Sequence, residues 1–190
     1  KNPIELTPEQ TKKIMELQTK VLSLPDGSRE KDVYTALSLK AQEEPIPTSL
    51  GDKVRSYRNQ SMLLNPKTLG RNILGNMSFA SVEKGFTDPV ATMIDKGLSK
   101  FTGQRTRAMP QYGEYFSGLG KGAKYGAEDV NLGINTRKLG GRFDTGTRPA
   151  FDGGVLGKTE KALAYGLQVP DRAFYEATYA ESLANQMKAK

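Results

Sequence analysis

The chain has 190 residues, of which 28 are basic and 21 acidic, and it carries a formal net charge of +7 without any cysteine or histidine. These absences exclude disulfides, zinc sites built from thiolate or imidazole, and every nucleophilic mechanism that relies on cysteine or histidine. Hydrophobic residues make up only 36% of the sequence, less than in most compact domains. We therefore expect a modest core, in an elongated helical array or in a fragment that buries part of its surface against something else.

Two helices joined by a turn are expected at the N-terminus. Thr7 and Pro8 have the pattern of a helix start, and apolar residues then recur at three- or four-residue steps until Pro25. A turn at residues 25–28 leads to a second helix that ends before Pro45. Residues 1–47 are therefore predicted to form a helical hairpin, and residues 48–190 a second helical module. The alternative is one continuous domain.

The segment 61–76 is the most specific part of the sequence. After a predicted helix over residues 49–63, Asn65 can cap a helix whose first residue is Pro66, because proline at that position loses only an amide that the helix does not use. Leu69, Ile73 and Met77 then recur at four-residue spacing and form an apolar stripe. We interpret these three residues as helix-packing candidates.

A second pairing of cap and proline occurs at Asp88 and Pro89. It predicts a new helix with an apolar face that extends to Phe101, and Gly103 is placed to end it in a left-handed cap. The same helix supports a minor functional alternative, attachment to a membrane surface, although Lys96 and Lys100 are its only cationic anchors. No run approaches the ~20 apolar residues of a spanning helix, so no transmembrane segment is expected.

Three glycines at four-residue spacing mark the helix predicted for residues 110–130. Gly118, Gly122 and Gly126 each cost about 1 kcal/mol relative to alanine inside a helix. They share one face and would let another backbone approach closely, which favours a tight helix crossing over a flexible loop. They are the other helix-packing candidates of the sequence.

The C-terminal part combines an irregular segment with two predicted helices. Residues 131–154 are rich in glycine and arginine and are predicted to form a loop region with room for short extended segments. Helices are expected over residues 155–168 and 170–190, separated at Pro170. Because no alternation typical of strands is sustained, the predicted fold is all-α, an irregular array of about seven helices.

Motifs for nucleotide and acid–base chemistry are incomplete. Gly157, Lys158 and Thr159 suggest the end of a phosphate-binding loop, but the first glycine of that motif would fall on Asp152. Paired carboxylates can perform acid and base chemistry without histidine, but the pairs in this chain are interpreted as solvent-exposed helix charges. Those pairs are Glu43 with Glu44, Glu128 with Asp129, and Glu176 with Glu181. No catalytic residue, cofactor or metal is predicted.

Most of the excess positive charge lies in the centre of the chain. Between Lys96 and Arg148 there are ten basic and four acidic residues, which is typical either of a solvated basic face or of a contact with a polyanion, and both interpretations stay open. Interleaved tyrosines would allow stacking on bases, so the alternative function is sequence-independent nucleic-acid binding with strong salt dependence. The candidate polyanion-binding residues are Arg105, Arg107, Lys121, Lys124, Arg137, Lys138 and Arg142.

Three segments, residues 62–76, 118–137 and 171–175, resemble regions of the large polyvalent proteins that bacterial phages, prophages and conjugative elements encode. The resemblance covers residues 30–190 and implies a mostly helical, noncatalytic accessory region of a long multidomain chain. It also implies a virion or transfer protein that is delivered with DNA, located in the virion or the bacterial host cytoplasm. Its partners would be flanking domains of the parent chain or other virion proteins, and DNA through the basic centre. The start at Lys1, without an initiator methionine, agrees with a piece of a longer protein.

Overall fold

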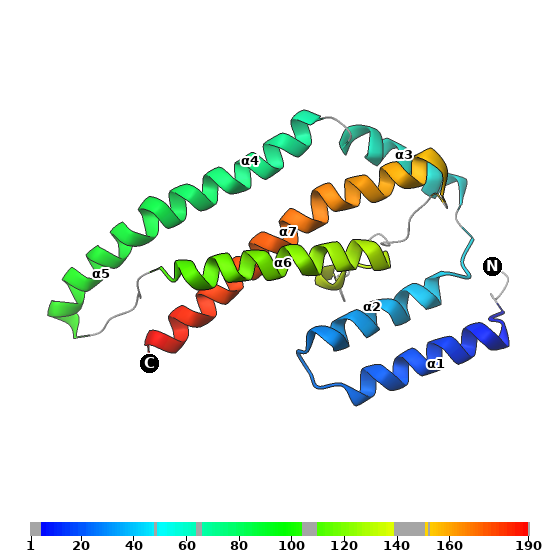
Figure 1. Cartoon of the computed structure of the whole chain (residues 1–190), viewed down its shortest axis with the longest axis horizontal. Helices are drawn as coiled ribbons and strands as arrows, with labels where there is room; N and C mark the ends of the chain where they lie inside the picture. Colours follow the sequence, from blue (N-terminus) through cyan, green and yellow to red (C-terminus); the bar gives the residue numbers. More distant parts are fainter. Residues whose placement is uncertain are drawn as a thin grey trace. The chain divides into compact units, whose positions relative to one another are not determined.

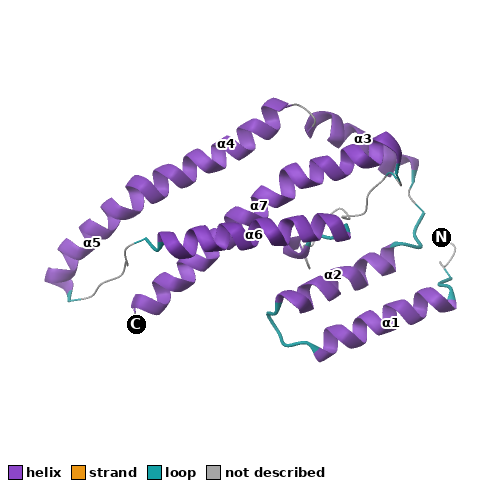
Figure 2. Ribbon diagram, viewed as in Figure 1, coloured by secondary structure: helices purple, strands orange, loops and turns teal. Residues whose placement is uncertain are grey.

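The structure is a computed structural model that describes residues 5–47, 49–63, 66–103, 110–138, 151 and 153–189. Within these ranges the chain is helical and contains no strand, so the all-α prediction is confirmed (Figures 1 and 2). The α-helices are α1 (Pro8–Ser23), α2 (Arg29–Glu43), α3 (Leu50–Leu63), α4 (Pro66–Val82), α5 (Asp88–Thr102), α6 (Tyr112–Leu132) and α7 (Gly154–Ala189), with a π turn η1 (Glu83–Thr87) and a 3₁₀ turn η2 (Thr136–Lys138).

The chain divides into two compact units. Unit 1 comprises residues 1–61 and 127–165, and unit 2 comprises residues 62–126 and 166–190. This division differs from the boundary at residue 47 that the sequence suggested. Because α6 and α7 extend across the dividing points, each of these helices contributes residues to both units.

Unit 1 contains the predicted N-terminal hairpin, in which α1 and α2 pack against each other (Figure 1). The Thr7 hydroxyl accepts a bond from the Gln10 N–H at 3.3 Å, and the Gln10 side chain accepts one from the Thr7 N–H at 2.9 Å. This reciprocal pair is a capping box, which satisfies two amides at the start of α1. Ile14, Ala36 and Ala41 are buried and form the core of the hairpin.

In unit 2, α4, η1 and α5 follow one another in one continuous helical rod (Figure 1). An α-helix begins at Asp88, as predicted, but Asp88 is not its cap, because Thr87 (φ −65°, ψ −49°) and Asp88 (φ −67°, ψ −43°) are both helical. The π turn accommodates the proline instead, since the Asp88 N–H bonds to the Glu83 carbonyl, one residue further back than in an α-helix. Gly103 ends the rod with φ 70°, as predicted.

The three spaced glycines of α6 face the backbone of α7. A Cβ atom on Gly118 would lie 2.6 Å from the Glu176 carbonyl oxygen, and one on Gly122 would lie 2.5 Å from that of Arg172. A Cβ on Gly126 would lie 2.8 Å from the α-carbon of Val169. These distances are too short for any side chain, so the two helices cross with their backbones in close contact.

The expected break at Pro170 is absent, and α7 runs through it as a single helix of 36 residues. A proline inside a helix removes one backbone hydrogen bond and crowds the preceding turn. In this chain Val169 and Arg172 on either side of the proline lie against the α6 glycines. We attribute the continuity of α7 to this tertiary packing, which the local sequence does not reveal.

Candidate functional site

The predicted polyanion-binding residues are only partly described by the structure. Arg105, Arg107 and Arg142 lie outside the described residues, as does the side chain of Lys138. Lys121 and Lys124 are exposed on α6, and neither forms an ion pair within the described parts of the chain. Arg137, in η2 of unit 1, is exposed as well.

The tyrosines expected to accompany these cations have different environments. Tyr115 is only 6% exposed and is a core residue of unit 2, so it offers no ring face for stacking on a base. Tyr112 is partly exposed and donates its hydroxyl to the backbone, and Tyr125 is half-buried. Of the three described tyrosines in this set, Tyr115 is therefore unavailable for stacking, and Tyr112 is already engaged in a hydrogen bond.

The helix-packing candidates of α4 do not form a buried face. Ile73 is half-buried and Met77 is 53% exposed, while the side chain of Leu69 lies outside the described residues. Within the described chain Met77 is thus only partly covered, and its role in helix packing stays a prediction. By contrast, Gly118, Gly122 and Gly126 make the close helix contact described above.

A buried cluster of charges joins the rod to α7 in unit 2. The Lys84 Nζ lies 2.6 Å from Glu181 Oε2 and 2.9 Å from Asp88 Oδ2. The side chain of Glu181 is only 3% exposed, so its charge depends on Lys84. The expectation that Glu181 is a solvated helix charge is therefore wrong. Its burial follows from the packing of α7 against the rod, which sequence spacing does not show.

The same lysine also contacts the N-terminal end of α6. Its Nζ lies 5.7 Å from the centroid of the Tyr115 ring, within the range of a cation–π contact. The Tyr112 hydroxyl donates to the Lys84 carbonyl at 2.7 Å. That carbonyl lacks a normal helical partner, because the Asp88 N–H bonds to Glu83 and Pro89 has no N–H. Tyr112 thus satisfies a backbone acceptor that the π turn leaves free.

Burial and pairing shift two pKa values in this cluster. Burial lowers the pKa of Lys84, but the hydrogen bonds to Glu181 and Asp88 outweigh this effect and raise the pKa above its ordinary range. Burial also raises the pKa of the Tyr115 hydroxyl, and the nearby Lys84 charge opposes that rise only in part. Both groups therefore keep their protons at neutral pH, and the cluster holds a fixed positive charge between two carboxylates.

A second buried cluster lies in unit 1, where the start of α2 meets the end of α6. Arg29 Nη2 lies 2.5 Å from Asp129 Oδ1, and its Nη1 donates to the Thr136 hydroxyl. The other Asp129 oxygen accepts from the Thr136 N–H at 3.0 Å and from its hydroxyl at 2.7 Å. Asp129 is 3% exposed, so its interpretation as a solvated charge is also wrong.

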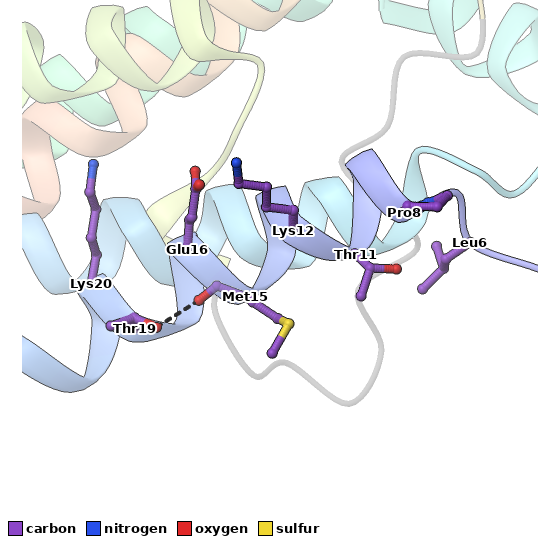
Figure 3. A pocket seen from close by; sticks show the side chains of 8 residues that line it. All are labelled: Leu6, Pro8, Thr11, Lys12, Met15, Glu16, Thr19 and Lys20. Carbon is purple, nitrogen blue, oxygen red and sulfur yellow. Dashed lines mark hydrogen bonds between the residues drawn. The ribbon is translucent and has the colours of Figure 1, made fainter.

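Neither cluster has the arrangement of an acid–base catalyst. In each, the buried carboxylate is paired with a cation, and the pair connects two helices that are distant in the sequence. Within the described ranges, no three acidic side chains lie close enough together to hold a metal ion. A groove along α1 is lined by eight described residues, from Leu6 to Lys20, whose side chains include a single acid (Figure 3). We conclude that the two charge clusters determine how their helices pack against each other.

The most unusual surface belongs to the rod, whose polar side faces the protein and whose apolar side faces solvent. Thr92 is 3% exposed, and Asp88 lies in the buried charge cluster on the same side. On the opposite side, exposure ranges from 39% for Val90 to 91% for Phe101. We name this apolar side the outer stripe; its residues are Phe79, Val82, Phe86, Val90, Met93, Ile94, Leu98 and Phe101.

The outer stripe reverses the arrangement that is normal for a surface helix. An amphipathic helix of a globular protein usually turns its apolar face to the core. None of the helices in the described parts of the chain is long and apolar enough to cross a bilayer. The periodicity was visible in the sequence, but the direction of the apolar face was not.

Comparisons with known proteins give no further information on identity, because no family model, curated protein or solved structure matches this chain.

Proposed function

We propose that the chain is a noncatalytic interaction module that works by presenting the outer stripe to another surface. The observation that carries this proposal is the exposure of the stripe, which reaches 69% for Phe86 and 91% for Phe101. Contiguous apolar surface of this kind is typical of binding sites in soluble proteins. The Lys84–Glu181 pair and the α6–α7 crossing hold together the helices of unit 2, which presents it.

The resemblance to polyvalent proteins supports a biological setting for such a module. We propose that it belongs to a long phage or mobile-element protein, delivered with DNA, in the virion or the bacterial host cytoplasm. Its partners there would be flanking domains or other virion proteins. Sequencing the surrounding genes tests this setting: portal or conjugation genes beside the reading frame support it, and an isolated housekeeping gene contradicts it.

A matched pair of substitutions tests whether the outer stripe is a binding surface. Leu98 is 57% exposed on the stripe, whereas Leu163 is 7% exposed in the core of unit 1. Leu98→Gln should change the free energy of unfolding by less than about 0.5 kcal/mol, and Leu163→Gln should lower it by about 3 kcal/mol. Urea denaturation followed by circular dichroism measures both. Equal losses would show that the stripe is part of the folded core and would contradict the proposal.

Exposed cations on α6 favour nucleic-acid binding as a second candidate function. Lys121 and Lys124 are both exposed and have no ion-pair partner within the described residues. Fluorescence anisotropy with labelled duplex and single-stranded DNA should then show binding that weakens steeply with salt. Lys121→Gln together with Lys124→Gln should make the slope of log K against log salt less steep by about 2, because two phosphate contacts are lost. An unchanged slope would remove α6 from the candidate interface.

A further inference from the structure

We propose that the rod formed by α4, η1 and α5 binds an anionic lipid surface, with the outer stripe inserted among the headgroups. This inference depends on the proposed function, because it names the surface that the stripe contacts. It is carried by two observations on the rod: the direction in which the apolar side chains face, and the distribution of the charges around them.

The charges on the rod are separated by sign. Its three acids, Glu83, Asp88 and Asp95, are all half-buried, and Asp88 lies in the charge cluster that contacts α7. Its exposed charged residues are all cations, so a surface that approaches the stripe meets positive charge without any exposed carboxylate. Anionic lipid headgroups are complementary to this pattern. The exposed cations are Lys67, Arg71, Lys96 and Lys100.

The shape of the stripe fits a flat surface. From Phe79 to Phe101 it follows one side of a helical rod for ~33 Å at the usual rise of a helix. Three phenylalanines, at positions 79, 86 and 101, are well exposed along it. The polar side of the rod, with Lys84, Asp88 and Thr92, is held against the protein. A helix with these properties lies in the plane of the membrane interface and does not span the bilayer.

The same charges disfavour a second copy of this chain as the occupant. Pairing one stripe with another would bring Lys96 and Lys100 of one rod close to the cations of the other. No exposed acid on either rod could neutralise them, and like charges across an interface oppose association. A partner protein would have to supply its own acidic surface. The experiment below distinguishes binding to such a protein from binding to lipid.

Tryptophan fluorescence can report contact of the stripe with lipid, because the natural chain contains no tryptophan. Phe86→Trp places one reporter on the stripe, and Leu22→Trp places a matched reporter on α1, where the leucine is 83% exposed. Vesicles of phosphatidylcholine, alone or with about one third phosphatidylglycerol, serve as the probe. With anionic vesicles, we expect a blue shift and quenching by brominated lipid for the Phe86→Trp protein and neither change for the Leu22→Trp protein.

Flotation of the full chain with the same vesicles separates the apolar and electrostatic contributions. Phe86→Gln combined with Ile94→Gln should weaken partitioning by about tenfold or more, because two exposed apolar side chains lose their lipid contact. Lys96→Gln and Lys100→Gln should each weaken it about fivefold. Lys121→Gln and Lys124→Gln on α6 are the matched controls and should have little effect. Binding should decrease from about 0.05 to about 0.5 M salt.

Several results would overturn the lipid proposal. One is the absence of flotation with anionic vesicles at low salt. The others are binding to neutral vesicles that is as strong as binding to anionic ones, and binding by the Phe86→Gln/Ile94→Gln protein that is as strong as binding by the parent protein. Stripe-dependent dimerisation in sedimentation equilibrium, or stripe-dependent binding to an acidic protein without lipid binding, would also overturn it while leaving the interaction module intact. The module itself fails only if Leu98→Gln destabilises the fold like a core substitution, so the two failures are distinguishable.

Discussion

At the scale of single residues, the charge pair between Lys84 and Glu181 shows how the chain uses ionisable groups. The pair is almost fully withdrawn from solvent, with side-chain exposures of 14% and 3%. A buried pair of this kind adds little net stability over apolar residues, but loss of one partner is costly because the other is left charged and buried. The cluster therefore specifies how the rod docks on α7 more than it stabilises the folded state.

A double-mutant cycle tests this interpretation of the pair. Lys84→Met should lower the free energy of unfolding by about 3 kcal/mol, because it leaves Glu181 buried without a cation. Glu181→Leu should have an effect of similar size, and the double variant should recover much of the loss. Urea denaturation of all four proteins gives the coupling energy. Additive single effects would mean that the two side chains do not interact in solution.

The raised pKa values of Lys84 and Tyr115 predict how stability depends on alkaline pH. Both groups have ordinary pKa values of about 10 in an unfolded chain. Since the folded state holds both protons more tightly, the stabilisation is complete below about pH 10 and is lost as pH rises above that value. Denaturation at a series of pH values should show this decline, and Tyr115→Phe should make it less steep.

Absorbance at the tyrosinate band gives an independent measurement of the same shift. The chain has eight tyrosines, and Tyr115 should ionise above the ordinary pH range of a tyrosine, because burial raises its pKa. The Tyr115→Phe protein should lack this last component. A titration curve that merely loses one eighth of its amplitude, without a change of shape, would contradict the predicted shift.

At the scale of elements, the glycine face of α6 gives the sharpest prediction. Gly122→Ala would place a Cβ 2.5 Å from the Arg172 carbonyl oxygen and 2.7 Å from the Ala173 α-carbon. Both are backbone atoms, so α6 and α7 must move apart, which should cost about 2 kcal/mol or more. Urea denaturation measures the loss.

Gly120 is the matched control within the same helix. A Cβ at Gly120 would meet nothing within 4 Å. Gly120→Ala should therefore stabilise the protein by about 0.5–1 kcal/mol, because alanine is a better helix former than glycine. The two substitutions are chemically identical and two residues apart, so opposite signs would identify the crossing. A stabilising effect of both would mean that α6 and α7 do not touch in solution.

Local sequence signals predicted most helices but missed several of the contacts between them. The capping box at Thr7, the cap at Gly103 and the glycine spacing of α6 depend on a few neighbouring residues, and each appears in the structure. Asp88 was misinterpreted as a helix cap and Pro170 as a helix boundary, because a π turn and the contact with α6 keep the backbone helical there. Tertiary contacts of this kind have no local signature.

The exposure of the candidate surfaces was harder to predict from the sequence than the helices, because it too depends on tertiary contacts. The apolar periodicity that ends at Phe101 is evident in the sequence, but which way a helix turns its apolar face depends on what the opposite face contacts. Here the polar side is held by Glu181, more than 80 residues further along the chain. The burial of Asp129 by Arg29, 100 residues away in the sequence, escaped prediction in the same way.

At the scale of the whole molecule, the two units are linked by shared helices. Both α6 and α7 contribute residues to each unit. Helix formation is cooperative, so the loss of one part of a helix weakens the adjacent turns. Despite the division into two units, the chain should therefore unfold in a single transition.

A destabilising substitution in unit 1, read out in unit 2, tests this expectation. Asp129→Ala leaves Arg29 without its carboxylate and the Thr136 N–H without its acceptor, which should cost about 3 kcal/mol. Phe116→Trp, at a residue 67% exposed on α6 in unit 2, supplies the reporter. Asp129→Ala should lower the urea midpoint of tryptophan fluorescence as much as that of circular dichroism. If the fluorescence midpoint stays at the value of the parent protein while the dichroism shifts, the units unfold separately and the shared helices do not couple them.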